Sequence, residues 1–458
     1  MLERLRQSAG RLGYRTIMEA VIEEISERKF HPGQRLPPQR EMAHDLGVAV
    51  ATVSRAYTEL EAQGFVASHV GRGTFVSERR ETRPSVATSV QDDIDLATYR
   101  VPVPAMNDPL RKVLRTILAD LDPNRILGSA PTAGLPLHRA AMAEWLVMSA
   151  RIQVGADQIV LTNGGQHAVM AALSTVTRQG QAIATEVLTD PRMKAVASFL
   201  DRRLLAIACD EHGLLPDALD HLCRTQEVAA VYCTTRNQNP TNVTLSLERR
   251  MALVEVARKF DLPIIESDIY GTLSNDAVAP IFTIAPERTH FITSLGRIVG
   301  PGMKVGCLVS PIADVVRTQL GVAMSTGVAT PIATELAARL ILGGQIEAMV
   351  EWQRTENLRR VALFNAHSLL SGAITNPSSP HVWLTLPEPW RAEDFVEAAA
   401  GHGVLIAPSH SFVVGRQSVP HAVRLVLGAA QTFDHLEVAC QKLHALIATQ
   451  PRPSSSAG

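Results

Sequence analysis

Residues 157–178, with the sequence DQIVLTNGGQHAVMAALSTVTR, join a short apolar run to a longer apolar stretch through a pair of glycines. The first run has the length and composition of a buried strand, and the stretch that follows has those of a helix. Gly164 and Gly165 stand where the strand turns into the helix. The first backbone amides of a helix have no partner within it, so Gly164, Gly165 and Gln166 are expected to offer a site for an anion such as phosphate.

The same alternation of strand and helix continues to about residue 310. Runs typical of strands are QAIATE, RLLAIACD, VAAVYCT, LPIIESD, HFITSLG and VGCLVSP, with helical stretches such as LSLERRMALVEVARKF between them. This order predicts an α/β fold with a mostly parallel sheet covered on both faces. From about Ile312 long helical stretches take over, and HVWLTLP, VLIAPSHSFVV and AVRLVLGA then predict a smaller C-terminal α/β lobe.

Polar residues of several types follow these strands, where ligands bind to such sheets. They are Asn239 in RNQNPTN, Asp268 and Tyr270 in ESDIYG, Ser294, Arg297 and Lys304 in SLGRIVGPGMKVG, and Arg424 in AVRLVLG. Each also has an ordinary structural interpretation, as a turn former, a core side chain or half of a surface ion pair. Taken one at a time, the structural interpretation is favoured.

The first eighty residues carry a different pattern. Met18, Val21, Ile22 and Ile25 form the stripe of an amphipathic helix, a second helix is expected between Pro38 and Gly47, and a third in ATVSRAYTELEAQG. The buried positions of the third helix are predicted to be Val53, Ala56, Tyr57 and Leu60. FVASHVGRGTFVSE then predicts a hairpin with a basic tip, so the order is that of a winged helix-turn-helix.

Bulk charge does not indicate nucleic acid, because residues 1–80 hold twelve Lys and Arg against ten Asp and Glu. The placement of a few side chains does, since the third helix can enter a major groove while the wing tip reaches the backbone. The residues expected to bind DNA are Arg35, Arg40, Thr52, Ser54, Arg55, Gly71, Arg72 and Gly73. Periodicity alone leaves open a three-helix adaptor whose arginines are only solvated.

The predicted domain organisation follows from one polar segment. SERRETRPSVATSVQDD, residues 77–93, lacks apolar periodicity and is expected to be a linker. The predicted parts are a DNA-binding domain at 1–78, a linker at 79–93, an effector-binding domain at 94–447 and a disordered tail at 448–458. The effector-binding domain is expected to divide into a large lobe at about 94–330 and a small lobe at about 331–447.

The composition excludes several classes of protein. Hydrophobic residues make up 46% of the chain and charged residues 19%, as in globular proteins. Five cysteines without CxxC spacing and the lack of a signal segment predict a reduced, cytoplasmic protein without a metal site. No apolar run approaches the roughly 18–20 residues of a membrane span, so no membrane partner is expected.

Two segments resemble known families. GQRLPPQREMAHDLGVAVATVSRAYTELEAQGFVASHVGRGTFV resembles the winged helix-turn-helix of GntR-type repressors along its whole length, although Val50 stands where many relatives have arginine. The motif positions that match are Arg40, Thr52, Arg55, Gly71 and Gly73. From about Ile94 to Ile447 the order of the polar turns resembles the fold-type I aminotransferase domain. The whole chain therefore resembles MocR-type regulators, which join a GntR-type DNA reader to an aminotransferase-like effector domain.

The resemblance implies roles for the polar residues. Gly164, Gly165, Ser294 and Lys304 would form the phosphate cradle of a pyridoxal-phosphate-like ligand. Asn239 and Tyr270 would face the hydroxyl group of its ring. Arg424 would bind a substrate or effector carboxylate, a bidentate contact suited to guanidinium.

Three departures from the family pattern carry more information. Ser267 replaces the aspartate that pairs with the ring nitrogen, although Asp268 could shift in by one residue. Thr189 and Asp190 occupy the place of the tyrosine that stacks on the ring. Arg297 replaces the Schiff-base lysine, and a guanidinium stays protonated and is a poor nucleophile.

These departures predict a transcription regulator without catalytic residues. It would bind duplex DNA as a homodimer and sense a small anionic effector, pyridoxal phosphate or an amino acid, held without a covalent bond. The alternative is an active pyridoxal-phosphate-dependent aminotransferase with an appended DNA reader, in which Lys304 takes the covalent role. A dimerisation module without a ligand would explain the lost catalytic residues, but not the retained phosphate cradle and Arg424.

Overall fold

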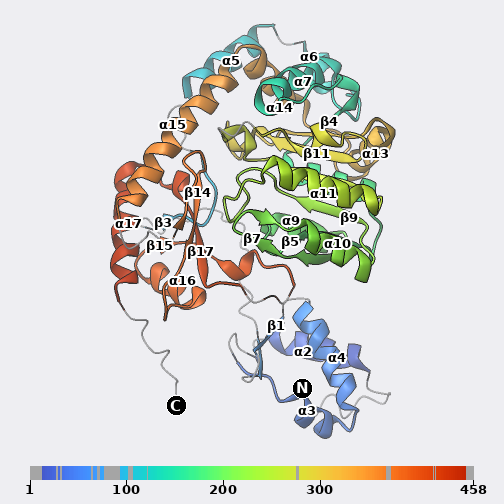
Figure 1. Ribbon diagram of the computed structural model, residues 1–458, viewed down its shortest axis with the longest axis vertical. Helices are drawn as coiled ribbons and strands as arrows, with labels where there is room; N and C mark the ends of the chain where they lie inside the picture. Colours follow the sequence, from blue (N-terminus) through green and yellow to red (C-terminus); the bar gives the residue numbers. More distant parts are fainter. Residues whose placement is uncertain are drawn as a thin grey trace. The chain divides into compact units, whose positions relative to one another are not determined.

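The computed structural model of the chain describes residues 13–26, 29–30, 34–62, 65–69, 73–76, 93–101, 107–120, 122–274, 278–367, 373–415, 417 and 419–449. The chain divides into two compact units, Met1–Val90 and Gln91–Gly458 (Figure 1). Within the described residues, no helix has the length and apolar composition that crossing a membrane requires.

The first unit contains three helices and a hairpin. They are α2 (Tyr14–Ser26), α3 (Gln39–Leu46), α4 (Val50–Ala62), β1 (Val66–His69) and the antiparallel β2 (Gly73–Val76). The predicted stripe of α4 is confirmed, because Val53, Ala56, Tyr57 and Leu60 are all buried. On α2 the fully buried residues are Ile17 and Val21, while Met18, Ile22 and Ile25 are half-buried around the same core, since the helix turns Ile17 toward α4.

The segment before α3 pairs with β2, the second strand of the hairpin that forms the wing. Arg35 pairs with Phe75, and the Leu36 amide donates to the Thr74 carbonyl oxygen at 2.8 Å. The Arg35 side chain passes close to Gly73, where an added Cβ would lie 2.6 Å from Arg35 Nε. Gly71 and Arg72, the predicted basic tip, lie outside the described residues.

A seven-stranded sheet forms the centre of the second unit. Its order is β4 (Ile159–Thr162), β12 (Gly306–Val309), β11 (Thr289–Ser294), β10 (Ile264–Ser267), β9 (Ala230–Cys233), β5 (Ala182–Glu186) and β6 (Arg203–Ile207). β12 is antiparallel to both of its neighbours, and the other pairs are parallel. The mostly parallel sheet expected from the alternating pattern is confirmed.

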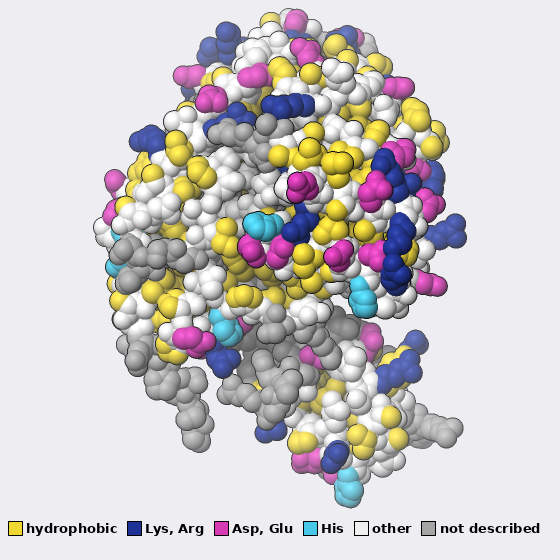
Figure 2. All heavy atoms as spheres, viewed as in Figure 1, with side chains coloured by type: hydrophobic (Ala, Val, Ile, Leu, Met, Phe, Trp, Pro, Cys, Tyr) yellow, Lys and Arg dark blue, Asp and Glu magenta, His cyan; other side chains and the backbone are white. Residues whose placement is uncertain are grey.

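Helices cover both faces of this sheet (Figure 1). One face packs against α8 (Gly165–Val176), α9 (Pro191–Phe199) and α13 (Val315–Ser325). The other packs against α10 (Pro216–Thr225), α11 (Leu247–Lys259) and α12 (Ile281–Ile284), beside the short pair β7 (Cys209–Asp210) and β8 (Gly213–Leu214). On the face shown in Figure 2, basic and acidic side chains of this unit lie next to one another. The Arg224–Asp220 and Arg258–Glu255 ion pairs belong to α10 and α11 of this unit.

The C-terminal lobe is built on a smaller antiparallel sheet. Its strands are β13 (Ala373–Ile374), β14 (His381–Thr385), β17 (Ala422–Val426) and β16 (Ala407–Pro408), packed with α16 (Ala392–Gly401) and α17 (Phe433–Ile447). The predicted tail begins too early by two residues, because Ala448 and Thr449 still bond back to α17.

The two lobes exchange segments, which corrects the predicted division at residue 330. β3 (Ile94–Asp95), placed in the large lobe by the sequence analysis, pairs with β15 (Val404–Leu405) of the small lobe. α14 (Pro331–Leu342), placed in the small lobe, packs with α5 (Asn107–Asp120) and α7 (Pro136–Ala150), which the short helix α6 (Pro123–Leu127) separates. α15 (Gln345–Asn365) runs from one lobe to the other (Figure 1), with Val350 in the large core and Phe364 in the small one.

Candidate functional site

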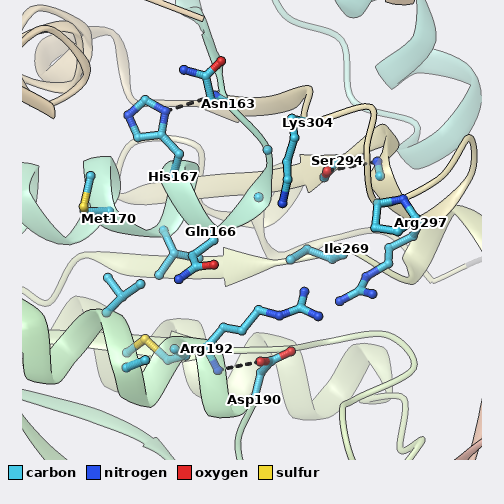
Figure 3. Close-up of a pocket in the computed structure, with 18 of the residues that line it drawn as sticks. Asn163, Gln166, His167, Met170, Asp190, Arg192, Ile269, Ser294, Arg297 and Lys304 are labelled. Atoms are coloured by element: carbon cyan, nitrogen blue, oxygen red, sulfur yellow. Dashed lines mark hydrogen bonds between the residues drawn. The ribbon is translucent and has the colours of Figure 1, made fainter. Parts of the chain in front are cut away.

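A cavity of about 740 Å³ opens where β4 and β11 end and where α8 and α9 begin (Figure 3). Six of the predicted ligand-binding residues line it: Gly164, Gly165, Gln166, Ser294, Arg297 and Lys304. Asn239, Asp268, Tyr270 and Arg424, also predicted, do not line it. The structure therefore brings the expected phosphate cradle and Arg297 together, whereas the other four predicted residues are not part of the cavity lining.

The first turn of α8 forms one end of the cavity. Gly164 adopts φ 85°, and α8 starts at Gly165 without a side-chain cap, so its first amides are directed at the cavity. Gly306 permits this geometry, because an added Cβ would lie 2.6 Å from the Gly164 carbonyl carbon. Unpaired amides at a helix N-terminus favour an anion.

Lys304 reaches the same end of the cavity from the connection between β11 and β12 (Figure 3). Its backbone lies against Gly164, with Lys304 Cα 3.7 Å from the position of an added Cβ there. In the described part of the chain, no carboxylate lies within 4 Å of its ammonium group. The charge of Lys304 is therefore available to a ligand.

Ser294 lines the cavity, but its hydroxyl group is already engaged. It donates to the Val305 carbonyl oxygen at 3.0 Å and accepts from the Gly296 amide at 3.2 Å. Ser294 thus holds the loop that carries Arg297 and Lys304 in shape, and its proton is committed to that loop.

Arg297 ends the short helix η4 (Leu295–Arg297), and it is 5% exposed. Its guanidinium carbon lies 4.1 Å from the ring centre of Tyr99 and 4.9 Å from that of Tyr270. The Tyr99 hydroxyl also donates to the Arg297 carbonyl oxygen at 2.7 Å. Stacking on aromatic faces stabilises a buried cation, but no acceptor among the described residues meets the guanidinium N–H groups.

Asp190 and Asn239 connect the cavity wall to Arg424. The Asp190 carboxylate accepts from the Arg192 amide and from Asn239 Nδ2, both at 2.8 Å. Burial raises the pKa of Asp190, but the positive charge and amide of Arg192, together with Arg297, outweigh this and hold the pKa below its ordinary value. The carboxylate therefore stays ionised.

Arg424 is engaged with the protein itself. Its terminal nitrogens donate to the Ala97 carbonyl oxygen at 2.6 Å and to Asn239 Oδ1 at 3.0 Å, and its Nε has no partner among the described residues. The planar group lies 4.9 Å from the Phe412 ring centre. These two hydrogen bonds use two of its five N–H groups, so Arg424 keeps donors for a carboxylate, Nε among them, although it does not line the cavity.

Asp268 does not shift into the cavity. Its carboxylate forms a buried two-point ion pair with Arg236, with Oδ1 2.9 Å from Arg236 Nε. Gly271 is required beside it, since an added Cβ would lie 1.9 Å from Asp268 Oδ1. Ser267, one residue earlier, lies within hydrogen-bonding reach of the hydroxyl group of Tyr232, which lines the cavity.

Three residues near the site were missed by the sequence analysis. Tyr99 and Arg297 are 198 positions apart, and no local pattern links them. His381 is buried behind Tyr270 with its ring centre 5.2 Å away, and burial and the charge of Arg424 lower its pKa to about 3. Arg192 enters the cavity from the start of α9 (Figure 3). The sequence indicated only that it follows a proline that begins a helix.

The structure describes six of the predicted DNA-binding residues: Arg35 precedes α3, Arg40 lies on α3, Thr52, Ser54 and Arg55 lie on α4, and Gly73 begins β2. Arg40 and Arg55 are exposed, and Arg55 covers the Tyr14 ring with its guanidinium carbon 4.2 Å from the ring centre. Thr52 and Ser54 are half-buried on α4, and Val50 at its start is 46% exposed. No cluster of metal-ligating side chains exists among the residues described in either unit.

Comparison with known proteins identifies both units. The family described as bacterial regulatory proteins, gntR family, matches residues 13–76, and the family described as aminotransferase class I and II matches residues 91–443. The chain is 27% identical over 436 residues to the uncharacterized HTH-type transcriptional regulator YdeF of Bacillus subtilis, covering 95% of this chain and 94% of the relative. It is 25% identical over 308 residues to the HTH-type pyridoxine biosynthesis transcriptional regulator PdxR of Corynebacterium glutamicum, covering 64% of this chain and 65% of PdxR.

Solved structures share the fold of the second unit. An archaeal alanine:glyoxylate aminotransferase matches with a TM-score of 0.71 at 22% identity, over 86% of this chain and 94% of its own. Kynurenine aminotransferase of Pyrococcus horikoshii matches with a TM-score of 0.72 at 22% identity, over 78% and 91%. The expected architecture, a winged helix-turn-helix followed by an aminotransferase-like fold, is confirmed.

Proposed function

The chain belongs to the aminotransferase class I and II family and joins to it a gntR-family domain, as MocR-type transcription regulators do, and from this premise we propose that its second unit senses a small anionic effector without forming a Schiff base. The first unit would carry the response to DNA. The protein would then be a sensor built on an enzyme fold.

The observation that carries this proposal is the environment of Arg297. A guanidinium group remains protonated and forms no imine with an aldehyde under physiological conditions. Arg297 is nevertheless buried, packed against two tyrosine rings, and without an acceptor among the described residues. Burying an unpaired charge is costly, so a site of this kind is suited to an anion that supplies the missing partner.

The residues present fit a phosphate ester better than they fit the full chemistry of pyridoxal phosphate. The amides of Gly165 and Gln166 and the ammonium group of Lys304 suit a phosphate, whereas the Gly164 amide, expected to be free, donates to the Thr162 carbonyl oxygen at 2.9 Å. Ser267 offers no carboxylate to a ring nitrogen, so the electron-withdrawing role of the cofactor has no support at that position. The name of PdxR refers to pyridoxine biosynthesis, and pyridoxal phosphate is therefore the first effector to test.

DNA binding is assigned to Arg35, Arg40, Thr52, Ser54, Arg55, Gly71, Arg72 and Gly73, by resemblance to the GntR-type motif. We propose a cytoplasmic homodimer, since paired half-sites on DNA match a two-fold protein. An exposed apolar stripe supports the dimer: Ile312, Val316, Leu320 and Met324 are 64%, 76%, 58% and 77% exposed at intervals of four residues along η5 (Ile312–Asp314) and α13. Contiguous apolar surface of this kind marks a protein contact.

A working aminotransferase is the second candidate, and Lys304 is the observation in its favour. Its amine enters the cavity and would have to take the covalent role. Against this, Lys304 lies against the first turn of α8, where a phosphate is expected. The sensor therefore remains the better-supported function.

Borohydride reduction separates the two candidates. The full-length protein would be incubated with pyridoxal phosphate, followed by thermal shift, reduced and mapped by peptide mass. The sensor predicts a higher melting temperature, because a ligand that binds only the native state stabilises it, and no adduct within residues 294–306. Arg297→Lys is the matched variant and is expected to gain a reducible adduct. A stoichiometric adduct on Lys304 of the unmodified chain, with measurable transamination, would restore the enzyme.

A further inference from the structure

Three cationic side chains enter the cavity from three different elements. Arg192 comes from α9, Arg297 from η4, and Lys304 from the connection between β11 and β12. The only acidic side chain on the cavity wall within the described residues is Asp190. The wall therefore carries a clear excess of positive charge.

The two arginines face each other across the cavity. Figure 3 shows their guanidinium groups directed toward one another above Asp190, with Lys304 approaching from the opposite side. Asp190 pairs with neither guanidinium within 4 Å, because its oxygens are taken by the Arg192 amide and Asn239. Both positive charges lower the pKa of Asp190, but Asp190 forms no ion pair with either arginine.

Arg297 is the independent sign of a ligand. It is only 5% exposed, it is directed into the cavity, and no acceptor among the described residues meets its N–H groups. Arg192 is exposed and likewise has no acceptor for its side chain in the described part of the chain. Two facing cations repel one another at short range. An anion between them attracts both, and these two attractions outweigh the repulsion.

We propose that the cavity binds a phosphorylated carboxylic acid, with its phosphate at the start of α8 and Lys304 and its carboxylate between Arg192 and Arg297. This rests on the proposed effector-sensing function and adds the class of effector. Guanidinium groups match the planar geometry of a carboxylate, and their charge-assisted hydrogen bonds are among the strong ones. Arg424 is not the first contact for this carboxylate, because it does not line the cavity.

The proposal predicts a preference for two anionic groups over one. Isothermal titration of the full-length protein would compare 3-phosphoglycerate with glycerol 3-phosphate, which lacks the carboxylate, and with glycerate, which lacks the phosphate. We expect 3-phosphoglycerate to bind about tenfold or more tightly than either, the effect of gaining charge-assisted hydrogen bonds. Arg192→Gln should remove the preference over glycerol 3-phosphate and leave the affinity for glycerol 3-phosphate within about twofold.

Arg178→Gln is the matched control, since Arg178 is exposed and lies outside the cavity; it should keep the preference. Equal binding of 3-phosphoglycerate and glycerol 3-phosphate, or a preference that survives Arg192→Gln, overturns the two-anion assignment. If pyridoxal phosphate and glycerol 3-phosphate bind while the carboxylate adds nothing, the proposed sensor stands without this inference. If no phosphate ester binds at all, both fail.

Discussion

Replacing Asp268 with asparagine is expected to destabilise the aminotransferase-like unit without removing its ligand. The sequence analysis left Asp268 as a candidate partner of a ring nitrogen, whereas the structure joins it to Arg236. Both side chains are buried, with 1% and 5% exposure, and the guanidinium meets the carboxylate at two points. The Asp268→Asn substitution would keep the shape of the side chain and remove its charge.

The expected magnitude follows from this burial. Removing one partner of a buried ion pair costs about 3–5 kcal/mol, because the remaining charge loses its compensation away from water. The Arg249–Asp210 pair has the same two-point form, with Oδ2 3.0 Å from the terminal nitrogen, but its side chains are 18% and 28% exposed. Asp210→Asn is therefore the matched control, and a surface pair of this kind contributes at most about 1 kcal/mol.

Urea unfolding followed by tryptophan fluorescence measures this difference. The four tryptophans, Trp145, Trp352, Trp383 and Trp390, all lie in the second unit, so the signal reports on that unit alone. Thermal shift with pyridoxal phosphate on the same variants measures binding. An Asp268→Asn protein that is as stable as the Asp210→Asn control but no longer binds the ligand would refute the structural role of Asp268.

Arg40→Ala should weaken binding to duplex DNA about tenfold and lower the slope of log affinity against log salt by about one, since one phosphate contact is lost; gel-shift titrations with an unchanged slope would contradict the assignment. Leu320→Glu should give a monomer in light scattering at micromolar concentration, and a persisting dimer would exclude α13 as its interface. Burial and the charge of Arg424 lower the pKa of His381 from 6.5 to about 3. The free energy of unfolding should therefore be fully retained above pH 6.5 and be about 2 kcal/mol lower at about pH 5, because the unfolded chain takes up a proton that the folded chain does not. Denaturant titrations should show a weaker pH dependence for His381→Gln, and an unchanged pH dependence would exclude His381 as its source.

Most strands of the large sheet could be predicted from the sequence because they are buried on both faces. β4, β9 and β10 are four-residue runs without an exposed position, which local composition reveals. The division into lobes could not be predicted in the same way. β3 joins β15 across about three hundred positions, and α14 follows α13 in the chain but packs on α7, so both placements depend on tertiary packing alone.

The candidate site likewise has parts with a local sequence signal and parts that depend on residues distant in the sequence. The start of α8 and the loop with Arg297 and Lys304 carry local signals, and the structure brings them together. The partners of Arg297 depend on Tyr99, which is distant in the sequence. For Asp268 a signal was present: side chains alternate along a strand, and Asp268 shares the parity of Glu266, whose carboxylate accepts from the amides that open α12. That parity places Asp268 on the face opposite to the cavity.

The affinity of the full-length protein for DNA upstream of its own gene, measured by fluorescence anisotropy with and without saturating pyridoxal phosphate, tests the central claim most directly. A sensor predicts that the dissociation constant changes by about fivefold or more, the lower range of coupling between two sites. It also predicts that Arg297→Gln binds the same DNA without ligand and loses this response. An identical dissociation constant with and without a ligand shown by thermal shift to be bound would contradict effector sensing through this cavity.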